Sequence, residues 1–330
     1  MLVLGNGFDL DLGYKTGYMD FFGNDNPEGE GRFPFMEKGK DYHILGKYLV
    51  KCKTIKEWNG LENVLAEYGR VDPSKDFKRL FDGLTSKGGV VYSVGNLLNR
   101  IFGKLGKKQS ARKSARDDHG DYNRLAESLK AYLASVELGR PRAGSAAARL
   151  LKAVGAARPA ARVFSFNHTD FEEIGRALGV PVAAPVYVHG NAKDGDMVLG
   201  VGDHVELRPT AQYLYKTSNA NYHSSNIFEA LDSSDEVYIF GLSLSQGDYA
   251  YFEDFFSKIS SGAYGPSRKF VRIFTYDDAS RSAILSNLRK MNKGLIKLDG
   301  YADFDVIRTK DDIDESKFLH LLSRLQSPSA

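Results

Sequence analysis

The sequence has very little cysteine: Cys52 is the single one among 330 residues, so the chain cannot form an intrachain disulfide. A chain without disulfides suits a reducing compartment. Long hydrophobic runs are also missing, since no stretch approaches the roughly 20 apolar residues of a membrane-spanning helix. Residues 1–5 carry no basic segment, and their apolar run is far shorter than that of a signal peptide. We therefore expect a cytoplasmic protein with no membrane partner.

An excess of charge of one sign is missing as well. The 45 Lys and Arg residues against 42 Asp and Glu residues leave a formal net charge of +3. Nothing in this balance requires a polyanionic partner. Aspartate, glutamate and histidine do not cluster at metal-ligand spacing, which disfavours a two-metal nuclease and predicts no metal site.

Apolar and aromatic residues are plentiful, with 42% hydrophobic residues, 18 Tyr and 20 Phe, so the chain can bury a sizeable core. After residue 160 the pattern alternates between short apolar runs and amphipathic segments. This alternation predicts an α/β protein with a Rossmann-like parallel sheet covered by helices on both faces. The expected strands are 163–166, 185–188, 197–201, 236–240 and 270–274. The expected helices between and after them are 170–178, 224–231, 248–259, 279–291 and 314–325.

The first strand starts almost at Met1 and ends in the glycine turn at Gly5, and a loop from residue 8 leads into a short helix at 18–22. Residues 41–136 show helical patterning, with further helices expected near 75–83, 90–103 and 121–136. We therefore predict a core of residues 1–22 and 160–330, interrupted by a mostly helical insertion at 23–159.

Four expected strands end in polar residues or glycine. Ligands of open parallel sheets bind outside the carboxyl ends of the strands, so these ends predict a site. Its candidate residues are Gly5, Asn6, Gly7, Phe8, Asp9, Asn167, Asp170, His189, Gly241, Ser243 and Asp248, together with Thr16, which also suits the cap of the helix at 18–22. Each has an ordinary structural interpretation too: the glycines as turn residues, Asn167 and Asp170 as helix caps, His189 as a satisfied core histidine, and Ser243 and Asp248 as loop residues.

These blocks together resemble the AbiH-type abortive infection family, bacterial proteins of phage defence. The resemblance rests on Gly5-Asn6-Gly7-Phe8-Asp9-Leu10, on 13–21, on Trp58-Asn59-Gly60-Leu61-Glu62, on Ser165 to Asp170, on Val188-His189-Gly190 and on Gly241 to Leu244 with Asp248. They occur in the expected order between residues 2 and about 256. Two positions depart from the family pattern: His168 stands where Tyr is usual, and Leu242 where His is frequent.

The family in turn resembles the sirtuin-like NAD-binding fold. That resemblance implies that the glycine turn holds a dinucleotide, that Asn167 lies beside the nicotinamide ribose, and that His189 supplies the catalytic imidazole. With one cysteine, this chain cannot carry the four-cysteine zinc module of many sirtuin deacylases.

The implied reaction is cleavage of the nicotinamide–ribose bond of NAD⁺, which is then a substrate. Nicotinamide leaves as a neutral molecule and needs no general acid, so orientation and a placed base matter most. Asn167 would fix a ribose hydroxyl or a water, and His189 would accept a proton. Backbone N–H groups around Gly5–Phe8 would hold the pyrophosphate, and Asp9 or Asp170 would stabilise the developing cation. Depletion of NAD⁺ during phage infection is the leading hypothesis, and a phage-derived trigger and self-association stay open.

Two alternatives remain. Residues 104–116 carry six basic and no acidic residues, which suits a nucleic-acid-binding or nucleic-acid-sensing protein with salt-dependent affinity, although a solvated basic loop is the plainer interpretation. A non-catalytic sensor of NAD⁺ or a related nucleotide is the other alternative.

Overall fold

The structure is a computed structural model that describes residues 1–22, 45, 58–71, 111–156, 161–222, 225–265, 268–292 and 296–326. The chain divides into two compact units. Unit 1 comprises Met1–Gly17, Tyr132–Val198 and Asn221–Ala330, and unit 2 comprises Tyr18–Ala131 and Leu199–Ala220. This division differs from the expected insertion at 23–159. Helix α8 (Ala146–Ala156) belongs to unit 1, and residues 199–220 belong to unit 2.

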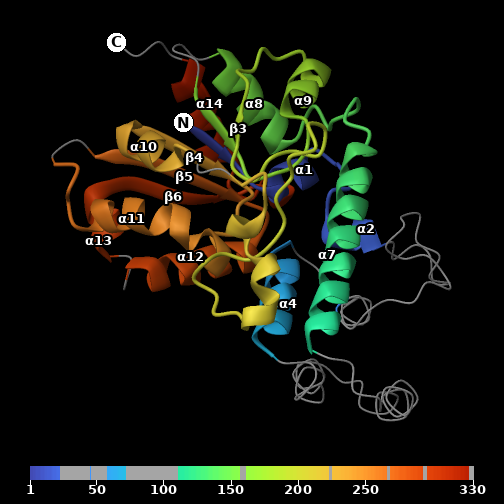
Figure 1. Ribbon diagram of the computed structural model, residues 1–330. Coiled ribbons are helices and arrows are strands. Elements are labelled where there is room, and N and C mark those ends of the chain that lie inside the picture. The colour runs from blue at the N-terminus through green and yellow to red at the C-terminus, as the bar shows by residue number, and fades with distance from the viewer. Residues whose placement is uncertain are drawn as a thin grey trace, which may run out of the picture. The chain divides into compact units, whose positions relative to one another are not determined.

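Unit 1 contains a parallel six-stranded sheet in the order β3-β2-β1-β4-β5-β6 (Figure 1). Its strands are β1 (Leu2–Leu4), β2 (Val163–Ser165), β3 (Val186–Tyr187), β4 (Glu236–Phe240), β5 (Lys269–Thr275) and β6 (Ala302–Arg308). This is the strand order of the dinucleotide-binding Rossmann fold. The expectation of a Rossmann-like α/β fold is therefore confirmed.

Helices cover both faces of the sheet because alternate side chains of each strand point to opposite faces. In β1, Leu2 and Leu4 pack into one core and Val3 into the other. The core that contains Leu2 and Leu4 is covered by α1 (Asn6–Asp11), α8, α9 (Phe171–Leu178) and α14 (Glu315–Gln326). The core that contains Val3 is covered by α10 (Ile227–Ser233), α11 (Tyr249–Ser260), α12 (Asp278–Asn292) and α13 (Ile296–Tyr301). Two short 3₁₀ turns, Gln246–Asp248 and Lys310–Asp312, complete unit 1.

Unit 2 is helical. It contains α2 (Tyr18–Phe22), α4 (Trp58–Arg70), most of α7 (Ala111–Ala134) and the 3₁₀ turns Pro209–Leu214 and Lys216–Ser218. Arg208, which precedes the turn Pro209–Leu214, contacts the end of α4. Its guanidinium lies 4.7 Å from the centre of the Tyr68 ring and donates to the Val71 carbonyl at 2.6 Å. Within the described ranges, no helix of either unit has both the length and the apolar character to cross a bilayer.

Three local expectations are wrong. The loop expected after Gly7 is helix α1, whose six residues are too few to show a helical period. The strand expected at 197–201 is absent, and Val201 alone forms a bridge with Tyr215, although Met197–Leu199 are buried as an apolar run would suggest. Strand β6 was not expected because Asp303 and Asp305 interrupt its apolar residues.

The other expected strands and helices of unit 1 are present with ends shifted by a few residues. The helices expected at 75–83 and 90–103 lie outside the described residues. So do residues 104–110 of the basic segment, whose remaining residues 111–116 begin α7.

Candidate functional site at the carboxyl edge of the sheet

The strand order changes direction at β1. The chain passes from β1 to β2 and β3 on one side, and then returns to place β4, β5 and β6 on the other side. In open parallel sheets this reversal opens a crevice outside the carboxyl ends of the two central strands. Here the two central strands are β1 and β4, and they are followed by Gly5 and Gly241.

The glycines at these two strand ends pack backbone against backbone. The Gly5 N–H donates to the Phe240 carbonyl at 2.9 Å, and the Gly7 N–H donates to the Gly241 carbonyl at 2.9 Å. A Cβ on Gly5 would lie 2.6 Å from the Gly241 oxygen, and Gly241 itself has φ +68°. Side chains at these positions would separate β1 from β4, so the structural interpretation of the glycines is sufficient to explain them.

This packing affects the expected pyrophosphate contact. The Gly5 and Gly7 N–H groups donate to carbonyls of the β4 end, and the Phe8 N–H donates to the Gly5 carbonyl at 2.9 Å. None of these three amides can reach a phosphate without breaking a backbone hydrogen bond. Phe8 is completely buried and packs edge-on against Phe240, so its role is in the core.

Asp9 and Asn167 form the centre of the candidate site. The Asn167 Nδ2 group donates to the Asp9 Oδ1 atom at 2.9 Å and to the Gly5 carbonyl at 3.0 Å. The Thr169 hydroxyl donates to the other Asp9 oxygen at 2.9 Å. A residue that follows β2 is thus bound to helix α1, which follows β1. Both Nδ2 hydrogens are therefore engaged, and only the Oδ1 atom of the Asn167 side chain can accept a hydrogen bond.

The Asp9 carboxyl is 1% exposed. Burial raises the pKa of Asp9 to about 7, against the opposing effect of the hydrogen bonds donated by Thr169 and Asn167. A carboxyl that titrates near neutrality can change its protonation state under cellular conditions, and such groups concentrate at functional sites. Thr16 reaches the same turn, where its hydroxyl donates to the Asn6 Oδ1 atom at 2.8 Å.

His189 follows β3 and is 7% exposed. Its ring packs edge-on against Phe166 at 5.5 Å and against Tyr251 of α11 at 5.7 Å between centroids. The neighbouring residues bind the end of β2 as well, since the His168 Nδ1 atom lies 3.0 Å from the Gly190 oxygen. A carbonyl only accepts, so Nδ1 of His168 carries the proton. The segments 5–9, 167–169 and 189–190 thus lie at the same edge of the sheet, linked by direct contacts.

The other two candidate carboxylates act as caps. Asp170 Oδ1 accepts the N–H groups of Glu172 and Glu173, both at 3.1 Å, at the start of α9, and Oδ2 pairs with Lys193 at 2.5 Å. Burial acts to raise the pKa of Asp170, but Lys193 and these N–H groups outweigh it and lower that pKa. The capping interpretation therefore holds for Asp170, and Asp9 is the candidate carboxylate that is bound to Asn167.

Asp248 has a similar capping geometry. Its Oδ2 atom accepts the Ser245 N–H at 2.9 Å and lies 3.4 Å from the Ser243 hydroxyl. These residues shape the turn between β4 and α11, next to Gly241.

A polar cavity of about 420 Å³ lies beside the loop that follows His189. It is lined by Val186, Tyr187, Asn191, Asp194, Asp196, Ser225 and Asn226. Inside this loop the Asn191 N–H donates to Asp196 Oδ1 at 2.7 Å, so the loop has a fixed shape. Neither Asn167 nor His189 lines this cavity. None of its lining residues was a sequence candidate, because their cavity forms only where two distant segments meet.

Thr169 was also missed as a site residue, although it lies within the Asn167–Asp170 motif. The sequence position of Thr169, between the candidates Asn167 and Asp170, could have indicated it, because a threonine hydroxyl readily donates a hydrogen bond to a carboxylate. In the part of the chain that the structure describes, no group of three or more His, Cys, Asp or Glu side chains is placed to hold a metal ion.

A protein-family model for bacteriophage abortive infection AbiH matches residues 1–264. The chain belongs to the AbiH family. The match includes the glycine turn, the Asn167 and His189 segments and the start of the β4–α11 connection, so every candidate residue lies within it. AbiH membership implies a role in abortive infection, a defence against phage. No curated protein and no solved structure matches the chain.

Proposed function

We propose that this AbiH protein acts in phage defence by hydrolysing NAD⁺ at the nicotinamide–ribose bond. The observation that carries the proposal is the hydrogen-bonded pair of Asp9 and Asn167. The pKa of Asp9 is raised to about 7, and the pair lies where the strand order of this Rossmann-like sheet reverses. The resemblance of the glycine turn, Asn167 and His189 to the sirtuin-like NAD-binding pattern supports the same conclusion. The polar cavity beside the His189 loop offers room for part of a nucleotide.

In this proposal Asn167 binds the substrate and Asp9 positions Asn167. Accepting the Nδ2 hydrogen fixes the carboxamide plane, which directs Oδ1 toward a ribose hydroxyl or the attacking water. Asp9 is too deeply buried to touch the substrate itself. His189 accepts the proton of the water, and its ring is held in place by Phe166 and Tyr251.

The proposed reaction is balanced without a general acid. The water oxygen bonds to the anomeric carbon of the ribose, and the electron pair of the breaking C–N bond neutralises the pyridinium nitrogen. The products are nicotinamide and ADP-ribose, and the proton of the water passes through His189 to solvent. Because the transition state resembles an oxocarbenium ion, orientation and local dipoles supply most of the acceleration.

The test is to incubate the purified full chain with NAD⁺ and to measure free nicotinamide. His189→Gln is expected to lower the rate by about 100-fold or more, as for the loss of a general base. Asn167→Ala is expected to lower it similarly, with thermal unfolding used to confirm that the variant is folded. His320→Ala, which changes an exposed histidine on α14, is the matched control and should keep the wild-type rate.

Equal nicotinamide release by wild type, His189→Gln and Asn167→Ala would contradict the assignment of the site. Calorimetric binding of NAD⁺ that depends on Asn167, without release of nicotinamide under any condition that activates defence, would identify a sensor instead of a hydrolase.

A further inference from the structure

The two edges of the sheet differ in length. Strand β6 forms one edge with seven residues, whereas β3 forms the other edge with two. A long edge strand presents N–H and C=O groups to which a strand of another chain can bind, and a very short one does not. β6 is therefore the edge at which the sheet of unit 1 could be extended.

The register of β6 shows which of its backbone groups point away from the sheet. The Thr309 N–H donates to the Thr275 carbonyl of β5 at 2.9 Å. Successive residues of a strand direct their N–H and C=O groups to opposite sides, so the odd-numbered residues of β6 face β5. The even-numbered residues direct theirs away from β5, and they are Ala302, Phe304, Val306 and Arg308. We call these outward groups the free edge of β6.

Asp305 binds the middle of this free edge. Its Oδ1 atom accepts the Val306 N–H at 2.8 Å. Its Oδ2 atom pairs with Lys317 of α14 at 2.7 Å. Both oxygens of the carboxylate are thus engaged, which fixes it against the backbone of its own strand.

Asp314 binds the carboxyl end of the free edge in a similar way. Its Oδ2 atom accepts the Arg308 N–H at 2.8 Å and the Arg308 Nε group at 2.9 Å, and its Oδ1 atom accepts the Nη2 group at 3.0 Å. The hydrogen bonds from Arg308 lower the pKa of Asp314 to about 2, so the carboxylate stays ionised at neutral pH. At the amino end, the Arg268 Nη2 atom donates to the Ala302 carbonyl at 3.3 Å.

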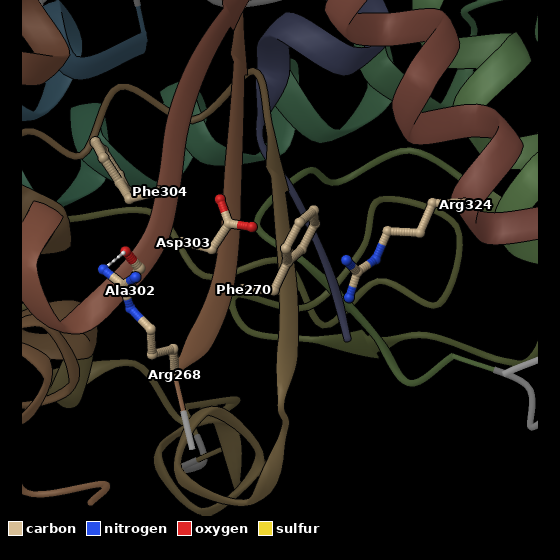
Figure 2. Close-up of a pocket in the computed structure, with 6 residues that line it drawn as sticks. All are labelled: Arg268, Phe270, Ala302, Asp303, Phe304 and Arg324. Carbon is tan, nitrogen blue, oxygen red and sulfur yellow. Dashed lines mark hydrogen bonds between the residues drawn. The ribbon is translucent and has the colours of Figure 1, made fainter. Parts of the chain in front are cut away.

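Phe304 is the exception on the free edge. Among the residues that the structure describes, neither its N–H nor its C=O group has a hydrogen-bond partner. Figure 2 shows its side chain on the same side of β6 as Ala302, with Asp303 on the other side, next to Phe270. A single open residue offers two backbone hydrogen bonds, whereas a stable strand pair needs a run of them.

We propose that Asp305 and Asp314 prevent the free edge of β6 from pairing with a second copy of this chain. A closed two-fold dimer places the two β6 strands antiparallel. When Phe304 lies opposite Phe304 of the second copy, the Val306 N–H must donate to the Ala302 carbonyl of that copy. Asp305 already holds this N–H, so the pairing cannot extend beyond Phe304.

Other registers meet similar obstacles. A register shifted toward the carboxyl end of β6 requires the Arg308 N–H, which Asp314 holds. The register centred on Phe304 also places Asp303 opposite Asp305 of the second copy, and like charges directly opposite each other destabilise a strand pair. The proposal does not depend on NAD⁺ hydrolysis, because none of these residues belongs to the candidate site.

The experiment compares Asp305→Val with Asp303→Val by analytical ultracentrifugation of the full chain over a range of concentrations. Both variants remove a carboxylate from the same face of β6 and add the same apolar side chain, but only Asp305→Val releases an outward N–H. Asp305→Val should self-associate at least about tenfold more tightly than wild type or Asp303→Val, because the two-fold pair gains two hydrogen bonds.

Phe304→Pro makes the test specific for backbone pairing. Proline has no N–H group, and the Phe304 N–H takes no part in the pairing of β6 with β5, so an edge strand tolerates the change. The double variant Asp305→Val/Phe304→Pro should return to the self-association of the wild type, with thermal unfolding used to confirm that it is folded. An apolar contact made by the new valine alone would persist in the double variant.

Amide hydrogen exchange tests the two aspartates in the wild-type chain, where folding of a variant plays no part. After correction for neighbouring side chains, the Val306 and Arg308 N–H groups should exchange at least about tenfold more slowly than the Phe304 N–H. In Asp305→Val, measured at a concentration too low for association, only the Val306 N–H should lose this protection.

Equal protection of the Phe304 and Val306 N–H groups in the wild type would overturn the proposal. Equal self-association of Asp305→Val and Asp303→Val would also overturn it. Self-association of Asp305→Val that survives Phe304→Pro would overturn it as well, because that result identifies an apolar surface contact in place of strand pairing.

Discussion

The two halves of the sheet are built differently. In the half formed by β1, β2 and β3, the strands have only three, three and two residues. In the half formed by β4, β5 and β6, they have five, seven and seven. We call these the motif half and the ladder half. The strands of the ladder half are joined by long runs of backbone pairing, whereas those of the motif half have few ladder hydrogen bonds of their own.

Polar side chains replace the missing pairing in the motif half. Asn167 and Thr169 bind Asp9, and the Tyr187 hydroxyl donates to the Thr169 carbonyl at 3.1 Å and accepts the Phe171 N–H at 3.0 Å. The residues that carry the candidate chemistry are therefore also the residues that hold the strand ends together. A substitution there changes folding and function together, so loss of activity alone does not identify a catalytic group in this half.

The largest effect is expected where the two halves meet, at Gly241. Gly241→Ala places a methyl group against the Gly7 backbone at a positive φ. The left-handed conformation costs about 1–2 kcal/mol for alanine, and a clash with backbone adds about 3 kcal/mol, so we expect a loss of about 4–5 kcal/mol in the free energy of unfolding. Denaturant unfolding measures this loss.

Gly179→Ala is the control for Gly241→Ala. Gly179 ends α9 with φ +66°, but a Cβ there meets no atom within 4 Å. It should cost only the conformational part, about 1–2 kcal/mol. Equal losses in the two variants would show that the close backbone contact between the ends of β1 and β4 adds nothing to the cost of Gly241→Ala. The junction of the two halves would then be no more sensitive to an added side chain than a helix end.

The next largest effect is expected in the motif half, where Asp9 should make the free energy of unfolding depend on pH. Because burial raises the pKa of Asp9 to about 7, the folded chain retains a proton that the unfolded chain releases near pH 4. The stability that this carboxyl contributes is therefore full below about pH 4 and is lost as the pH rises through about 7. At about 1.4 kcal/mol for each pKa unit, the fall is at most on the order of 4 kcal/mol.

Asp9→Asn cannot ionise, so its free energy of unfolding should lack this fall between about pH 4 and pH 7. Urea unfolding at intervals across this range compares it with wild type and with Asp235→Asn, which changes an exposed carboxylate and should keep the wild-type profile. A wild-type curve that does not fall in this range would mean that Asp9 remains ionised in the folded chain.

Ile307 tests the ladder half. It is 1% exposed in β6 and packs in the core with Phe274 and Phe318. Ile307→Ala should cost about 3 kcal/mol through lost burial and the cavity left behind. The change should leave both nicotinamide release and NAD⁺ binding unaltered in the folded fraction, because Ile307 lies in β6, at the opposite edge of the sheet from β2 and β3. A selective loss of NAD⁺ binding in Ile307→Ala would contradict that separation.

Sequence patterns predicted most of the sheet but little of the site geometry. Periodicity shows a strand or helix when enough residues repeat, as in β5 and α12, and it fails for the six residues of α1. It failed for β6 because alternating aspartates look like a loop, although at this edge strand they pair with Arg272 and Lys317. Family motifs placed Gly5, Asn167 and His189 at one edge correctly, because parallel strands share the direction of their ends.

The contacts inside the site were beyond the reach of the sequence. The Asn167–Asp9 bond joins residues that are 158 positions apart, and no local pattern records such a pairing. The same holds for the burial that raises the pKa of Asp9. Asp9 and Asp170 look equivalent in the sequence. They differ only because one is enclosed beneath the glycine turn and the other caps α9 and pairs with Lys193.

The smallest effect is expected at an ion pair of the ladder half. Lys317 of α14 pairs with Asp305 of β6 at 2.7 Å, and its side chain is 52% exposed. Exposed pairs of this kind contribute about 0–1 kcal/mol because water and salt screen the attraction and two long side chains lose freedom. Lys317→Gln should therefore lower the free energy of unfolding by less than about 1 kcal/mol, and even less at high salt, in denaturant titrations. A loss as large as that of Ile307→Ala would mean that polar contacts hold the ladder half together too, and that the two halves differ only in strand length.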